Sequence, residues 1–426
     1  KLIRLMKNEL KKLLKKKSFY IVTFIFILFC ILTNVIYKTG LDYVIDSDVN
    51  ISELEQENED LDLTSDEDLL IYVENLTMIE KEHLKKEYSS NIANYLIDNY
   101  LTTTIYNMYE AEYILEDLSL YQEYYNELQN DLKLVSDNNW EYFLNERISY
   151  LKERCNATTG IENIRYNRLL ELAQYRSGNH IPYDTDNYLH NSLAFIEENT
   201  FEYINLLNDE AKTKEEEERL TYLEGQMSIH EYVLEHEEDI LNEADLRSVL
   251  INFSQEFGIF ILIYVIMMAG SIVSEEYSRG TIKYLLTKPF RRSTILTSKL
   301  LVVLLLIPGI MIFMSLIEIL IGGIILGFSS LSVPVVLFSN GAITSYSVIG
   351  YLASEFLSII PMYLVIGLLA FMMSTITAST SAAITVSFLF YLLGNVISNL
   401  ALVYHLPIFK TCVSLYCNFS YLITNS

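Results

Sequence analysis

The chain has 426 residues, of which 51% are hydrophobic, yet its formal net charge is −25. A single soluble domain rarely combines so apolar a composition with so high a charge, so the two properties must be separated along the chain. Most acidic residues fall within residues 38–250. Such an acidic surface repels phosphate, which disfavours nucleic-acid binding. The composition therefore predicts a membrane protein with one large acidic insert.

The chain begins with a basic amphipathic segment, residues 1–17, in which eight cations accompany a single carboxylate, Glu9. An apolar run follows that resembles a signal peptide. No small-residue cleavage site separates this run from the acidic stretch at Asp42. We therefore interpret residues 18–37 as a retained transmembrane span.

Five apolar runs are long enough to cross a bilayer, which takes about 20 residues. These runs are Phe19–Tyr37, Phe257–Val273, Leu300–Phe328, Phe356–Ser374 and Ala382–Tyr404. The predicted fold class is therefore mainly α, a polytopic membrane protein whose residues 251–404 hold spans two to five. Because the sequence stops without a basic inner tail, we expect a sixth span beyond Ser426. The alternative is a five-span protein with an external tail.

Lysine and arginine residues beside the spans predict the orientation. Residues 1–17 and the loop 275–299 are both basic, which favours the cytoplasmic side for both. One span separates each of them from residues 38–250. The insert is therefore expected to be an extracellular domain.

The insert is expected to be helical, because glycine and proline are scarce and no alternating strand pattern occurs. Two stripes of apolar residues have helical spacing. The first is Leu223, Met227, Leu234 and Leu241, and the second is Tyr106, Tyr109, Tyr113, Leu120 and Tyr124. His230 interrupts the first stripe, which favours bundle packing over a long coiled coil. The turn-rich residues 177–184 are expected to divide the insert into two helical halves. Its many tyrosines suit either a thin helical core or a binding surface.

Residue patterns typical of catalysis or metal binding are missing from the sequence. No GxxxxGK[ST] loop could cradle nucleotide phosphates, and no Ser/His/Asp or Cys/His arrangement stands out. HEYVLEH, residues 230–236, has Leu234 where a zinc-binding helix would need its second histidine. We therefore expect no enzyme activity, no metal and no cofactor in this chain, and ATP hydrolysis would need a separate subunit.

A charged loop, SEEYSRGTIKYLLTKPFRRS over residues 274–293, connects the second and third spans. Its first part suits a short amphipathic helix in which Glu275 or Glu276 pairs with Arg279 in the favoured carboxylate-first order. Pro289 then ends the helix, because the residue before proline is driven away from helical angles. Such a segment either lies on anionic lipid headgroups or docks in a groove of a cytoplasmic partner.

Residues 275–299 closely resemble the signature of ABC type-2 exporter permeases, E-E-x-x-x-G-T-[IL]-x-x-L-L-x-x-P-x-x-R-x-x-[IL]-x-x-x-K. The resemblance implies a coupling helix that docks on a cytoplasmic ABC ATPase subunit, which would hold ATP and Mg²⁺. The residues assigned to ATPase coupling on this basis are Glu275, Glu276, Arg279, Gly280, Thr281, Ile282, Leu285, Leu286, Pro289 and Arg292. Ile295 and Lys299 complete the matched pattern.

The same resemblance implies a multi-pass protein of the bacterial cell membrane that assembles with a second permease copy or a paralogue. Leu2–Lys17 resembles the interfacial N-terminal helix of that family, on the cytoplasmic side. Residues 405–426 would then form an extracellular gate-like segment before the last span. The insert resembles no domain that we can name.

Glu318 lies within the third predicted span, where a carboxylate costs roughly 2.5–3.5 kcal/mol on insertion scales. We expect it to face the bundle interior or a cavity. Two interpretations stay open. Glu318 either lines a translocation path or binds a cation, or it is a neutral, hydrogen-bonded residue that fixes helix packing.

Three functions are compatible with these patterns. The first is export of an amphipathic peptide, an antimicrobial or another hydrophobic substrate, driven by a separate ATPase. The second is extrusion of sodium or another cation, for which Glu318 is the local support. The third is a non-exporting scaffold that transmits ATPase motion to the extracellular domain.

Overall fold

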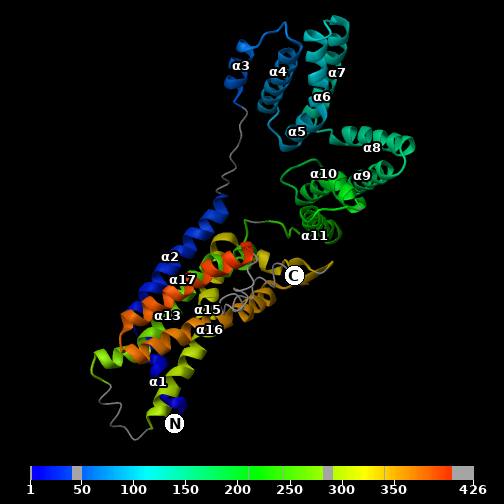
Figure 1. Ribbon diagram of the computed structural model, residues 1–426. Coiled ribbons are helices and arrows are strands. Elements are labelled where there is room, and N and C mark those ends of the chain that lie inside the picture. Colours follow the sequence, from blue (N-terminus) through cyan, green and yellow to red (C-terminus); the bar gives the residue numbers. More distant parts are fainter. Residues whose placement is uncertain are drawn as a thin grey trace. The chain divides into compact units, whose positions relative to one another are not determined.

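The computed structural model describes residues 2–40, 50–209, 211–242, 244–281, 291–339 and 341–404. These residues form two compact units. The first, called the membrane unit, combines Lys1–Leu41 with Asn242–Ser426, and the second, called the insert unit, comprises Asp42–Leu241. Both are built almost entirely from α-helices (Figure 1), which confirms the predicted mainly α fold class.

Among the described residues of the membrane unit, four helices are long and apolar enough to cross a bilayer. They are α2 (Lys17–Thr39), α13 (Phe253–Ser278), α15 (Arg292–Leu326) and α16 (Val348–Thr377). The fifth predicted span falls on α17 (Thr380–Tyr404). Within the described residues, the part of α17 that counts as an apolar helix is Thr380–Gly394, which is shorter than the four spans. Residues 405–426 lie outside the described residues, so the gate-like segment and the sixth span stay predictions.

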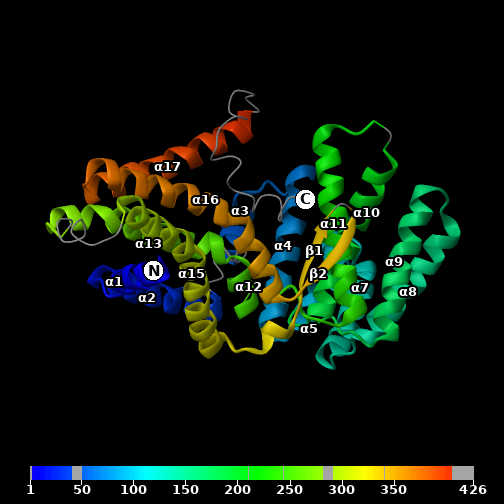
Figure 2. The same ribbon diagram turned by 90° about the horizontal axis from the view of Figure 1, so that it is seen from below.

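α13 is the central helix of the membrane unit. It packs against α2, α15, α16 and α17, which lie around it in Figure 2. Its side chains are apolar on all faces, as expected of a helix that is surrounded by other helices. Phe257, Ile261 and Val265 have no exposed surface. α13 therefore holds its charged C-terminal residues in a fixed place against its neighbours.

Short elements connect the spans on one side of the membrane unit. α12 (Leu246–Ile251) precedes α13, and a 3-10 turn, η2 (Ser329–Ser332), follows α15. An antiparallel hairpin of β1 (Val335–Ser339) and β2 (Ala342–Tyr346) then leads to α16. This hairpin was not predicted, because each strand has only five residues.

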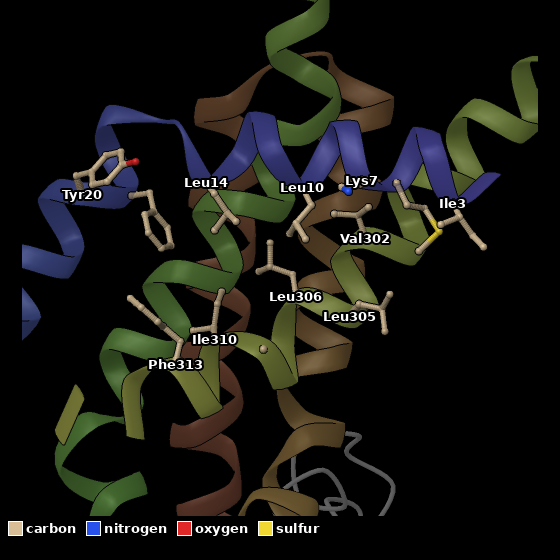
Figure 3. A pocket seen from close by; sticks show the side chains of 13 residues that line it. Ile3, Lys7, Leu10, Leu14, Tyr20, Val302, Leu305, Leu306, Ile310 and Phe313 are labelled. Atoms are coloured by element: carbon tan, nitrogen blue, oxygen red, sulfur yellow. The ribbon is translucent and has the colours of Figure 1, made fainter. Parts of the chain in front are cut away.

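α1 (Leu2–Leu14) is the amphipathic helix at the start of the membrane unit, and it packs against α15. Its apolar side faces a cavity of about 630 Å³ that α1, the start of α2 and α15 line. Figure 3 shows Leu10 and Leu14 on the α1 side of this cavity and Leu306 and Ile310 on the α15 side. The basic N-terminal segment is thus helical, as its periodicity indicated.

The insert unit is a series of helices that pack mainly against their neighbours in sequence (Figure 1). They are α3 (Ile51–Asp60), α4 (Asp66–Glu87), α5 (Asn91–Leu96), the π-helical turn η1 (Ile97–Leu101), α6 (Thr102–Tyr113), α7 (Leu118–Ser136), α8 (Trp140–Ala157), α9 (Ile161–Gly178), α10 (Tyr188–Asn208) and α11 (Lys214–His236). One hydrophobic cluster runs through the series from Leu84 on α4 to Leu234 on α11. The predicted helical insert is therefore confirmed.

The turn-rich residues 177–184 do connect two helices, α9 and α10, but they do not divide the insert unit into halves. Ile181 and Tyr183 from this segment are buried in the common core. The ring of Tyr183 stacks on Tyr95 with the centroids 4.8 Å apart. The prediction of two halves is wrong, because apolar side chains within the turn join both sides into one core. These tyrosines fit the core interpretation.

The apolar stripe predicted from Leu223 to Leu241 is shorter than expected, and His230 does not break it. α11 ends at His236, so Leu241 lies beyond the helix. His230 is buried on the stripe and stacks on the ring of Phe195 with the centroids 4.2 Å apart. The histidine therefore belongs to the packed face and does not interrupt it.

The tyrosine stripe predicted from residue 106 to residue 124 is divided between two helices, α6 and α7. Asp117 begins α7, because its side chain accepts hydrogen bonds from the backbone amides of Ser119 and Leu120 at 2.9 and 3.1 Å. An aspartate in this N-cap position satisfies amides that a helix start leaves unpaired. The helix start at Asp117 therefore divides the tyrosine stripe that the spacing predicted as one helix face.

Candidate functional site

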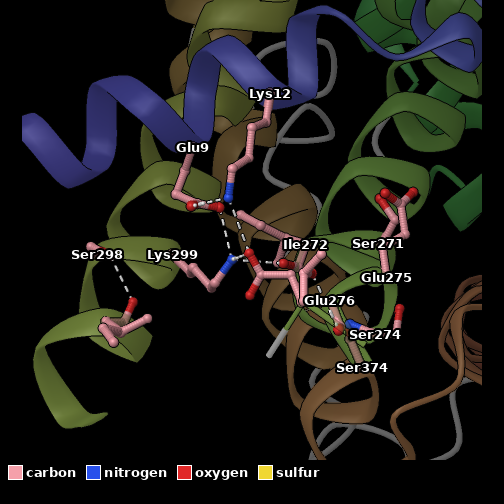
Figure 4. A network of polar contacts seen from close by, with 12 residues as sticks. Glu9, Lys12, Ser271, Ile272, Ser274, Glu275, Glu276, Ser298, Lys299 and Ser374 are labelled. Carbon is pink, nitrogen blue, oxygen red and sulfur yellow. Dashed lines mark hydrogen bonds and ion pairs between the residues drawn. The ribbon is translucent and has the colours of Figure 1, made fainter. Parts of the chain in front are cut away.

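Three helices of the membrane unit bring charged side chains together (Figure 4). α1 supplies Glu9 and Lys12, the end of α13 supplies Glu276, and the beginning of α15 supplies Lys299. These four residues are called the ion network below. Glu276 lies in the last turn of α13, where the negative end of the helix dipole disfavours a carboxylate. Cationic partners from other helices offset this cost.

Lys299 is the centre of the ion network, and only 2% of its surface is exposed. Its Nζ lies 2.7 Å from Oε2 of Glu9 and 2.9 Å from Oε1 of Glu276. Nζ also donates to the backbone carbonyl of Ile272 at 2.9 Å. These three acceptors match the three protons of an ammonium group. A buried ammonium in this geometry holds α1, α13 and α15 together.

Lys12 completes the ion network from the side of α1. Its Nζ lies 2.9 Å from Oε1 of Glu9 and 3.2 Å from Oε1 of Glu276. Burial opposes the charge of Glu9, but Lys299 and Lys12 hold the pKa of Glu9 below its usual value. Burial also opposes the charge of Lys12, yet Glu9 and Glu276 raise the pKa of Lys12. Both groups are therefore charged at neutral pH.

Glu275 makes a second set of contacts beside the ion network. Lys16, which directly precedes α2, donates to Oε1 of Glu275 at 2.8 Å and to Oγ of Ser271 at 2.5 Å. Burial lowers the pKa of this lysine. Arg279 lies 3.6 Å from Oε2 of Glu275, which confirms the predicted pairing in carboxylate-first order. The two adjacent carboxylates thus engage different elements.

The other predicted coupling residues lie after these carboxylates. Gly280 has a φ of 67°, a backbone conformation that glycine adopts without strain. Thr281 is exposed, and Arg292 is exposed at the first position of α15. Four further coupling residues lie outside the described residues, namely Ile282, Leu285, Leu286 and Pro289. The coupling helix and its role therefore stay predictions.

Comparison with known proteins identifies the family. Residues 3–414 match the family described as ABC-2 family transporter protein. The chain belongs to this family. As an ABC-2 transporter it is a multi-pass membrane protein, with four helices among the described residues that are long and apolar enough to cross a bilayer.

One relative of this ABC-2 transporter is an uncharacterized protein of Bacillus subtilis (strain 168), YhcI. The two chains are 28% identical over 144 residues, which is 33% of this chain and 46% of the relative. The match thus spans about half the length of that relative. No solved structure matches the chain.

Glu318 of the ABC-2 transporter is fully buried on α15. Asn34 of α2 donates from Nδ2 to Oε1 of Glu318 at 2.6 Å and to the backbone carbonyl of Cys30 at 2.8 Å. A Cβ added to Gly322 would lie 2.7 Å from Oδ1 of Asn34 and 2.6 Å from Cδ1 of Leu246. Such close packing fits the interpretation in which Glu318 fixes helix packing. Its role in translocation or cation binding stays a prediction.

The α1 members of the ion network and the partner of Glu318 were not predicted from the sequence. Glu9, Lys12 and Lys16 were not proposed as site residues, although Glu9 is the one carboxylate in a basic segment. An acid in that setting indicates a cationic partner elsewhere in the fold. Asn34, a polar residue within an apolar run, is the equivalent signal for Glu318. Neither signal identifies the partner, because the bonded residues are 290 and 284 positions apart.

Proposed function

We propose that the chain is the permease of an ABC exporter that moves an amphipathic peptide, an antimicrobial or another hydrophobic substrate outward. A separate ABC ATPase would dock on the loop after α13 and would hydrolyse ATP with its own Mg²⁺. The permease would assemble with a second copy or a paralogue. The observation that carries this proposal is the ion network, which joins the residues on either side of the loop.

The ion network offers a route by which movement of the loop would reach the spans. Oε1 of Glu276 and Nζ of Lys299 lie 2.9 Å apart although the whole loop separates them in sequence. Breaking this pair would leave buried charges uncompensated, which is costly. A displaced loop would therefore move the end of α13 and the start of α15 as one body, and Glu9 would carry α1 with them.

The buried carboxylates of the spans give no specific support to a cation as substrate, because each already accepts a hydrogen bond from a neighbouring helix. Glu318 is fully buried against Asn34, and Glu355 of α16 is 6% exposed and accepts from the backbone amide of Ser254 at 3.3 Å. A bound cation such as Ca²⁺ needs several oxygen ligands. Among the described residues, no group of three or more His, Cys, Asp or Glu side chains could hold a metal ion.

The proposed topology has α1 and the loop in the cytoplasm and the insert unit outside the cell. Glu224→Cys, at an exposed position of α11, should be labelled on intact cells by a membrane-impermeant thiol reagent. Lys11→Cys, at an exposed position of α1, is the matched control and should be labelled only after lysis. The reverse pattern would invert the topology.

The proposed partner can be tested by affinity purification of the intact chain from its native membrane, with mass spectrometry of the bound proteins. We expect an ABC ATPase subunit to co-purify. Its amount should fall in Arg292→Glu, which reverses an exposed charge at the edge of the loop, and should not change in Lys152→Glu on the insert unit. A folded chain that retains no ATPase would contradict the proposal.

A further inference from the structure

The cavity beneath α1 has two apolar walls. The α15 wall consists of residues spaced three and four apart, namely Val302, Leu305, Leu306, Gly309, Ile310 and Phe313. By helix rise this wall is about 16 Å long. Ile3, Leu10 and Leu14 form the wall on α1, and Tyr20 lines the cavity from the start of α2 (Figure 3).

The cavity is open on one side. Ile3 is 79% exposed, Tyr20 60% and Leu305 63%, and all three side chains line it. α15 is a membrane-spanning helix, so exposed apolar side chains on it meet lipid tails in a bilayer. The natural environment of the opening is therefore the hydrocarbon region next to the interface where an amphipathic helix lies.

α1 divides its polar residues between two sides. Glu9 and Lys12 face the ion network, away from the cavity. Arg4, Lys7 and Lys11 follow one another at helical spacing and are exposed, and they are called the basic stripe. Within the described part of the chain, no carboxylate pairs with this basic stripe. Lys7 also lines the cavity, so the basic stripe borders its opening.

We propose that the cavity binds an acyl chain of an anionic phospholipid whose phosphate lies on the basic stripe. Lipid tails are as apolar as the cavity walls, so the cavity alone does not distinguish one lipid from another. The uncompensated cations supply the selection, because anionic headgroups are attracted to basic residues at the membrane surface. The bound lipid would hold α1, and through Glu9 the ion network, at the interface.

Fluorescence quenching by brominated lipids tests this site in the full chain. Phe313→Trp places a reporter in the cavity wall, and Leu320→Trp, at a position that is 60% exposed on the same helix, is the matched reporter outside it. Trp140 is the only tryptophan of the chain, so the signal of the parent chain is the background to subtract. Vesicles would contain equal phosphatidylglycerol and phosphatidylcholine, with bromine on the acyl chains of one or the other.

We expect brominated phosphatidylglycerol to quench Phe313→Trp several-fold more than brominated phosphatidylcholine, and the two lipids to quench Leu320→Trp equally. Arg4→Gln, Lys7→Gln and Lys11→Gln should each lower this preference, and the three substitutions together should abolish it. Equal quenching of Phe313→Trp by both lipids would overturn the proposal. Absence of quenching by either lipid would also overturn it, because another protein surface would then cover the cavity. A preference that survives all three substitutions would refute the basic stripe as headgroup site.

Discussion

Glu276 and Glu318 are both buried carboxylates of the membrane unit, yet different partners stabilise them. Glu276, at the end of α13, contacts the ammonium groups of Lys299 and Lys12 at 2.9 and 3.2 Å. Glu318, within α15, accepts from the amide of Asn34 at 2.6 Å and meets no ammonium group among the described residues. The first arrangement depends on the charge of the carboxylate, whereas the second depends on an acceptor oxygen. Charge pairing thus joins three helices at the end of a span, and a hydrogen bond fixes two helices within it.

The largest effect is expected from Lys299→Met, which removes the central cation. Glu9 and Glu276 would remain buried beside each other with Lys12 as their remaining partner, and breaking a buried ion pair costs about 3–5 kcal/mol. Unfolding of the purified chain in detergent would measure the loss. Lys15→Met, which removes an exposed lysine just after α1, is the matched control and should change stability by less than about 0.5 kcal/mol. Equal losses in both variants would mean that the ion network does not stabilise the unit.

Replacing each carboxylate by its amide separates the two arrangements. Glu276→Gln keeps the shape but loses the charge that two ammonium groups contact, and hydrogen bonds to charged groups contribute about 1.5–3 kcal/mol. Glu318→Gln keeps an oxygen that accepts from Asn34, so its cost should stay below about 1 kcal/mol. The same unfolding measurement compares them. A larger loss in Glu318→Gln would reverse the comparison.

Gly322→Ala tests whether close packing surrounds Glu318. The new methyl group would lie 2.6 Å from Cδ1 of Leu246 and 2.7 Å from Oδ1 of Asn34, so both side chains would have to shift. Overpacking of this kind costs about 1–3 kcal/mol. Gly309→Ala on the same helix has no atom within 4 Å of the added carbon and should not destabilise the unit. Equal stability of the two variants would argue against the packing role.

The smallest effect is expected from acid. The folded-state pKa of Glu9 is held below its usual value of 4.5, so its ionised form stabilises the unit above pH 4.5. This contribution is lost as the pH falls through the lowered pKa. The stability difference between the parent and Glu9→Gln should therefore shrink on acidification. A difference that grows in acid would show that Glu9 is not held in its charged form.

Features that depend on residues close together in the sequence could be predicted. Hydropathy over some twenty residues predicted five spans, and four of them are long apolar helices among the described residues. One helical turn separates Glu275 from Arg279, so their pairing followed from spacing. The bonds from Lys299 to Glu9 and from Asn34 to Glu318 join residues 290 and 284 positions apart. Helical periodicity carries no information about such distant partners. They arise only when the spans pack around α13.

A distance between spin labels tests most directly whether the ion network moves as one body. The labels would replace Asn8, exposed on α1, and Tyr277, 48% exposed near the end of α13, with the native cysteines removed. The distance would be measured in the transporter with its ATPase bound, before and after ATP is trapped. We predict one distance that is the same in both states and that broadens in Lys299→Met. A shift of several ångströms between the two states would show that α1 leaves α13 during the cycle, and would contradict coupling through the ion network.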